Sequence, residues 1–81
     1  MELAIQRFNA GEFAAARKLT DDITNVLPEN HKMVWIRELY WGAVYLRGCC
    51  LQAQGGDGTG LKQLALSKVP AMRIQNRLRT Q

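Results

Sequence analysis

Residues 35–53 read WIRELYWGAVYLRGCCLQA, and the rest of the chain must pack around this segment. It carries two Trp, two Tyr and two Cys against three charged residues. A helix that is apolar on nearly every side must be covered by other elements rather than lie on a surface. Its charges and glycines, and its polar flanks, disfavour a membrane span. We therefore expect a central helix from His31 or Lys32 to Gln54, with the other elements packed around it.

Shorter amphipathic patterns flank this central helix. Apolar residues recur at steps of three and four through residues 12–27, which Gly11 and Pro28 bound on either side. No stretch alternates with period two over a useful length, so we expect no β-sheet. The sequence predicts one all-α domain over residues 1–81, with four or five helices in antiparallel hairpins. We expect core hairpins over residues 1–54, which hold helices over 1–10 and 12–27 and the central helix that ends at residue 54. A Gly-rich loop follows over 55–60. The basic C-terminal part, 61–81, is expected to hold helices over 61–68 and 71–79.

Two glycines lie inside the central helix. Gly42 and Gly48 each cost about 1 kcal/mol against Ala in a helix interior. They lie six residues apart and hence on different faces of the helix. We expect each glycine to allow a close approach by a neighbouring element.

Length and charge bound the possible functions. A chain of 81 residues builds a thin core, which oligomerisation can complete. The net charge of +4 hides an asymmetry, because residues 1–60 hold six basic and seven acidic side chains whereas residues 61–81 hold five basic and no acidic ones. The basic character therefore belongs to the C-terminal quarter.

The chain offers few groups for catalysis or metal binding. Cys49 and Cys50 are adjacent, so we expect free buried thiols with a raised pKa rather than a disulfide or a nucleophile. His31 is the only histidine, and Asp21 and Asp22 lie on a solvated helix face. We expect no enzyme activity, no catalytic, cofactor-binding or metal-binding residues, and no small-molecule substrate.

The N-terminus lacks the pattern of a signal peptide, which favours a cytoplasmic protein that does not bind a membrane.

The first hairpin resembles a tetratricopeptide repeat. That repeat places a small residue at the helix turn, an aromatic residue two positions later, an Ala three beyond it and a closing Pro. Gly11, Phe13, Ala16 and Pro28 match these four positions, whereas Trp35 lies one residue out of register with the next repeat. The resemblance implies an antiparallel helical hairpin.

A longer part of the chain is similar to the compact helical proteins of Domain of Unknown Function family 309. The likeness rests on FNAGEF at residues 8–13, on the stretch RELYWGAVYLRGCCLQAQGG and on GLKQL after it. The comparable positions are Gly11, Phe13, Asp21, Gly42 and the pair Gly55-Gly56. Where that family carries a His-Glu pair, this chain has Arg17 and Lys18, so the resemblance implies a fold and no chemistry.

Four aromatic residues are candidates for a partner interface: Trp35, Tyr40, Trp41 and Tyr45. They spread around the central helix, and a small domain can hardly bury all of them. Aromatic anchors are typical of binding hot spots. One interpretation is that they close a thin core, and the other is that part of this surface contacts a protein partner or a second copy of the chain.

Five cations form a candidate basic surface: Lys62, Lys68, Arg73, Arg77 and Arg79. Two short helices around a Pro-containing turn have the outline of a helix-turn-helix, although the turn lacks the usual Gly. The segment fits a solvated basic tail, a nucleic-acid contact or a surface for an acidic protein. We predict a non-enzymatic protein–protein interaction or assembly module, a homodimer being one form of it, with nucleic-acid binding through the C-terminal helices as the alternative.

Overall fold

The structure is a computed structural model that describes residues 1–70 and 72–78, and every described regular element is helical. The elements are α1 (Glu2–Asn9), α2 (Phe13–Val26), α3 (Val34–Ala53), α4 (Thr59–Lys68) and the 3-10 turn η1 (Arg73–Asn76). The all-α fold predicted from the sequence is confirmed.

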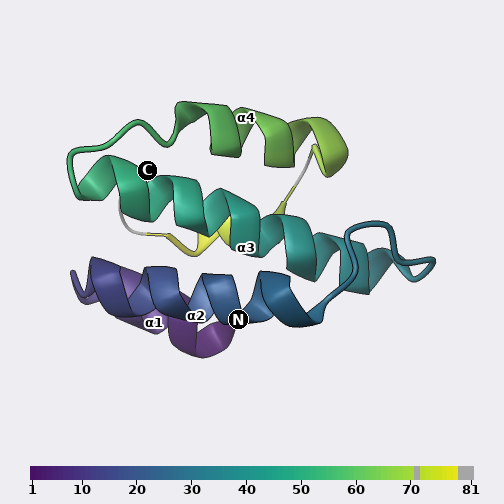
Figure 1. The fold of residues 1–81 in the computed structure, drawn as a ribbon, viewed down its shortest axis with the longest axis horizontal. Coiled ribbons are helices and arrows are strands. Elements are labelled where there is room, and N and C mark those ends of the chain that lie inside the picture. Colours follow the sequence, from purple (N-terminus) through teal and green to yellow (C-terminus); the bar gives the residue numbers. More distant parts are fainter. Residues whose placement is uncertain (71, 79–81) are drawn as a thin grey trace.

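Helix α3 is the centre of the molecule. It lies between the α1/α2 hairpin on one side and α4 on the other (Figure 1). The described chain after α4 returns along a third side of α3 (Figure 1), and its Arg77 contacts Asn9 of α1. The buried core follows α3 and takes residues from every element: Ala4, Ile5, Phe8, Ala16, Trp41, Val44, Tyr45, Leu46, Cys49, Cys50, Ala65, Met72, Ile74 and Leu78.

Glycine ends two of the helices in the same way. After α1, Gly11 has a φ of 82°, and the N–H of Glu12 donates to the carbonyl of Arg7 at 2.9 Å. After α3, Gly55 has a φ of 88°, and the N–H of Gly56 donates to the carbonyl of Leu51 at 2.8 Å. A left-handed residue with this bond is the Schellman cap, which satisfies carbonyl groups that the helix end leaves free.

The first hairpin is also fixed by side chains on both sides of its turn. The rings of Phe8 and Phe13 meet edge to face with their centroids 5.3 Å apart. Arg7 and Glu12 form an ion pair at 3.1 Å on the exposed side. These contacts hold α1 antiparallel to α2.

The two glycines of α3 differ in what they face. A Cβ on Gly48 would lie 2.7 Å from the carbonyl oxygen of Gly58, so Gly48 lets the start of α4 approach the helix closely. A Cβ on Gly42 would meet only Met1 at 3.5 Å and Ile74 at 4.0 Å, which are ordinary contact distances. The expected close approach is therefore found at Gly48 and not at Gly42.

Two predicted helix boundaries were wrong. Helix α3 begins at Val34 rather than at His31 or Lys32, because Met33 is extended and its N–H donates to Nδ1 of His31 at 3.0 Å. Helix α4 begins at Thr59, inside the Gly-rich stretch, where the N–H of Thr59 donates to the Asp57 side chain at 3.1 Å.

The predicted helix over 71–79 was also wrong over its described part. One four-residue 3-10 turn replaces it, preceded by an extended Met72. This backbone lets Met72, Ile74 and Leu78 all reach the core, where they are at most 7% exposed. Burial of these three side chains outweighs the weak helix preference of a short segment. Residues 71 and 79–81 lie outside the described residues.

Candidate interaction surface

The N-terminal end of α3 extends beyond the elements that cover it. An α-helix rises about 1.5 Å per residue, so the 20-residue α3 is roughly twice as long as the 10-residue α4. Figure 1 shows the first turn of α3 and the preceding loop reaching past α2 and α4 at the right. Residues 41–50 are almost entirely buried, whereas residues 34–40 are exposed or half-buried.

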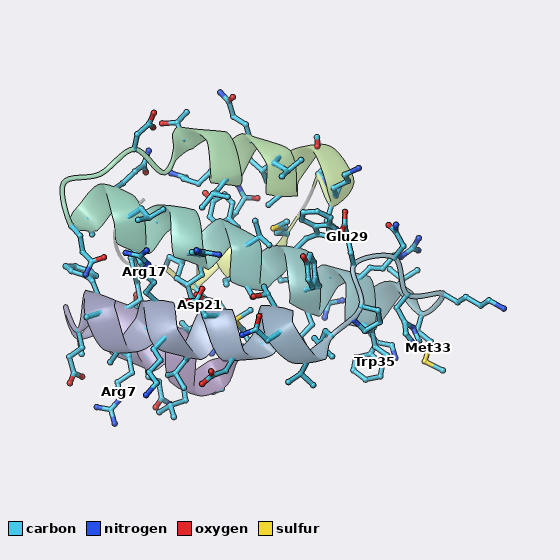
Figure 2. The ribbon with its side chains drawn as sticks, viewed as in Figure 1. Arg7, Arg17, Asp21, Glu29, Met33 and Trp35 are labelled. Atoms are coloured by element: carbon cyan, nitrogen blue, oxygen red, sulfur yellow. The ribbon has the colours of Figure 1, made fainter. Side chains whose placement is uncertain are left out.

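Large apolar side chains gather at this protruding end. The exposed fractions are 80% for Val26, 54% for Met33, 64% for Val34 and 64% for Trp35. Met33 and Trp35 project outward, away from the helices (Figure 2). We call these four residues the apolar end. Exposed apolar patches on small soluble proteins mark contact sites more often than chance would give.

The structure separates the four aromatic residues proposed for an interface. Trp41 and Tyr45 are 4% and 2% exposed, so they belong to the core and are unavailable to a partner of the folded chain. Tyr40 is half-buried and packs edge to face on Trp41 with ring centroids 4.9 Å apart. Only Trp35 has a largely exposed ring, because α3 turns the positions of the other three toward its neighbours.

Two grooves lie along different faces of the first turns of α3. Groove 1, of about 240 Å³, lies between α3, α1 and the segment after α4; its lining is Met1, Ile5, Trp35, Glu38, Leu39, Gly42, Met72, Arg73, Ile74 and Arg77. Groove 2, of about 360 Å³, lies between α3 and the end of α4; its lining is Asn30, Val34, Arg37, Trp41, Lys68, Val69 and Pro70. Trp35 stands at the edge of the first groove and Val34 at the edge of the second.

The described members of the proposed basic surface do not form one patch. Lys62 donates to Gln52 at 3.1 Å and lies 5.4 Å from the centroid of the Tyr45 ring. Arg77 pairs with Glu2 of α1, and this guanidinium lowers the pKa of the Glu2 carboxyl. Lys68 and Arg73 border different grooves. Arg79 lies outside the described residues.

The thiols of α3 are poor nucleophiles at neutral pH. Burial raises the pKa of Cys49, and burial with the neighbouring Cys49 raises the pKa of Cys50 to about 11. A protonated thiol reacts slowly because the thiolate is the nucleophile. The raised thiol pKa expected from the apolar sequence context is therefore found.

Metal ligands are likewise scattered in the part of the chain that the structure describes. Residues 1–70 and 72–78 contain no group of three or more His, Cys, Asp or Glu side chains placed to hold a metal ion. Asp21 instead faces Arg47 of α3 at 3.3 Å, and it points from α2 toward α3 (Figure 2). That pair ties α2 to α3.

The helices of the described segments are also too short or too polar to cross a membrane.

In comparisons with known proteins, no family model matches the chain, and neither a curated protein nor a solved structure matches it significantly. The resemblances to the tetratricopeptide repeat and to Domain of Unknown Function family 309 stay predictions.

Sequence reasoning identified Trp35 but missed its neighbours. Val26 and Val34 fit apolar helical patterns that predict burial, and Met33 was expected inside a helix. The signal that could have found them is the length of the central helix relative to its neighbours. A 20-residue apolar helix that packs between helices of 14 and 10 residues must leave turns uncovered.

Proposed function

We propose that this chain is a non-enzymatic helical module for protein–protein contact and assembly, and that the apolar end is its contact surface. The observation that carries the proposal is the exposure of Trp35, at 64%, beside three other exposed apolar side chains. Trp is among the residues most enriched in binding hot spots. Trp35 is not part of the hydrophobic core of the described residues, so core packing does not explain why a Trp stands at this position.

The partner is another protein or a second copy of this chain. A self-association version of the proposal is tested by light scattering after size exclusion across a range of concentrations. If the apolar end joins two copies, wild type runs as a dimer and Trp35→Ala runs as a monomer. Leu3→Ala removes an exposed apolar residue of α1 that lines neither groove, and it leaves the dimer intact.

A peptide-display selection on the immobilised chain tests partner binding. The proposal expects peptides that are enriched on wild type, lose binding on Trp35→Ala and keep it on Leu3→Ala. Circular dichroism confirms that both variants fold. The proposal fails if no peptide is enriched and no dimer forms, or if the enriched peptides bind both variants alike.

Nucleic-acid binding is the runner-up function. It would use the cations of residues 62–79, but Lys62 and Lys68 come from α4 whereas Arg73 and Arg77 lie beside α1 and another face of α3. Phosphate binding by a duplex favours cations that follow one continuous stripe. The test measures the affinity of the chain for an RNA or DNA oligomer. An affinity that falls steeply as salt rises, and that Arg73→Ala and Arg77→Ala each reduce, would favour this function over the first.

A further inference from the structure

We propose that groove 2 binds an acidic amphipathic segment of a partner protein, with an apolar side chain of that segment in the groove and its carboxylates on Arg37 and Lys68. This inference rests on the proposed function, and it specifies the chemistry of the partner. It starts from the different charges of the two grooves.

Positions 34, 37 and 41 share one face of α3, since residues three and four apart are neighbours on a helix. That face forms one wall of groove 2, and the end of α4 forms the other. Val34 is exposed at the edge, and the buried Trp41 indole forms the apolar floor. The groove therefore offers an apolar surface that is continuous with the apolar end.

Both charged residues of groove 2 are cations. Arg37 comes from α3 and Lys68 from α4, and no acid belongs to the lining that the described residues form. The ammonium group of Lys68 lies 5.9 Å from the centroid of the Trp41 ring, which places the charge over the floor of the groove. A ligand that enters between the two cations meets positive charge from both walls.

Neither cation has an ion-pair partner among the described residues. Arg7, Arg47 and Arg77 each pair with an acid, at Glu12, Asp21 and Glu2. Groove 1 has mixed charge by comparison, because Glu38 lines it together with Arg73 and Arg77. Glu29 lines the adjoining hollow that shares Trp41 with groove 2, but it is not part of the lining of groove 2 itself. Charge complementarity therefore favours groove 2 over groove 1 for an acidic ligand.

The start of α3 adds to this positive field. Its first turn holds no acidic residue, and the N-cap residue Met33 makes no side-chain capping bond. The N-terminus of a helix carries a partial positive charge when its N–H groups are free. A carboxylate near Val34 would gain from this charge as well as from Arg37.

The same charges disfavour a second copy in groove 2. A symmetric contact through this end would bring Arg37 and Lys68 of one copy toward those of the other, and like charges at an interface oppose binding. The phosphates of a nucleic acid would pair with the two cations, but its backbone would offer no apolar group to pack on the apolar walls between them. An acidic segment with an apolar anchor satisfies both.

The test uses a fluorescein-labelled helical peptide of Leu and Glu, with its Glu residues replaced by Gln in a twin peptide. We expect the Leu/Glu peptide to bind the full chain more tightly than its twin, as measured by fluorescence anisotropy. Arg37→Glu and Lys68→Glu should each weaken binding by about three- to tenfold, because reversal turns one exposed attraction into a repulsion. Lys18→Glu makes the same charge change on α2, away from the groove, and should change affinity by less than about twofold.

The outcomes separate this inference from the proposed function. If both peptides bind equally and Trp35→Ala still abolishes binding, the acidic-partner inference is overturned and the interaction function stands. If the Leu/Glu peptide binds and both charge reversals weaken it but Trp35→Ala has no effect, the acidic-partner inference stands and Trp35 is not part of the contact surface. An RNA oligomer that displaces the peptide and binds more tightly, or a dimer that Arg37→Glu dissociates, assigns groove 2 to another occupant and overturns the inference.

Discussion

At the scale of single residues, position on α3 decides what each side chain does. Gly48 faces the backbone at the start of α4, and Gly42 faces the ends of flexible side chains. Trp41 lies under α4, and Trp35, six residues earlier, lies beyond it. The same residue type therefore has a structural role at one position and an exposed surface at the other.

The two glycines give a matched pair of substitutions. Gly48→Ala should lower the free energy of unfolding by about 1–3 kcal/mol, because its Cβ would lie 2.7 Å from the Gly58 carbonyl oxygen and 2.8 Å from Cγ of Lys62. Gly42→Ala should leave it unchanged or raise it by up to about 1 kcal/mol, since Ala favours helix and no close contact forms. Urea unfolding followed by circular dichroism measures both. Equal effects would contradict the close approach at Gly48.

The buried thiols predict a loss of stability at alkaline pH. The pKa of Cys50 is raised from 9.0 to about 11, so the folded state holds its proton more tightly than the unfolded state. Stability from this group is full below the unfolded pKa and is lost as pH rises from 9.0 toward 11. Urea unfolding at several pH values should show a shallower decline for Cys50→Ala than for wild type. Parallel curves would show that Cys50 does not contribute.

At the scale of the element, the segment after α4 is an integral part of the core. A solvated basic tail was one interpretation of residues 61–81, yet Met72, Ile74 and Leu78 are buried. The side chain of Asn9 donates to the carbonyl of Arg77 at 2.9 Å, which fastens the segment to α1. Arg73 and Arg77 are exposed, whereas the apolar residues of the segment point inward.

This anchoring predicts that the segment contributes to stability. Ile74→Ala should lower the free energy of unfolding by about 2–4 kcal/mol, because it removes buried methyl groups and leaves a cavity. Leu64→Ala on α4, where Leu64 is 45% exposed, serves as the control and should cost much less. Denaturant midpoints compare the two variants. A small loss for Ile74→Ala would mean that the segment is detached in solution.

At the scale of the whole molecule, the helices form a compact body with one uncovered end. The radius of gyration of 11.4 Å is close to the value of about 12 Å expected for a single domain of this length. The dimensions of 33 × 21 × 20 Å show that the body is elongated. The uncovered end of α3 holds the apolar residues and the two grooves.

The two tryptophans report on this arrangement. Trp35→Phe leaves the buried Trp41 and should give emission that acrylamide quenches weakly, whereas Trp41→Phe leaves the exposed Trp35 and should give strong quenching. Wild type should show both components. If Trp35 of wild type is shielded from acrylamide and its quenching rises on dilution, a second copy of the chain covers the apolar end. Shielding of Trp35 at every dilution would contradict the exposure of its ring.

Local sequence pattern was sufficient to predict the all-α fold, the central position of residues 35–53 and the two turns at Gly11 and Gly55. Those features depend on local pattern and on backbone conformations that few residues other than glycine adopt. Packing between the helices sets which aromatic rings are covered, how the last described segment folds and which described cations have no acidic partner. These depend on the relative lengths of packed helices and on contacts such as that of Arg77 with Glu2, 75 residues apart in the chain. Burial is a property of the assembled neighbours, and a residue's own stretch of sequence does not specify it.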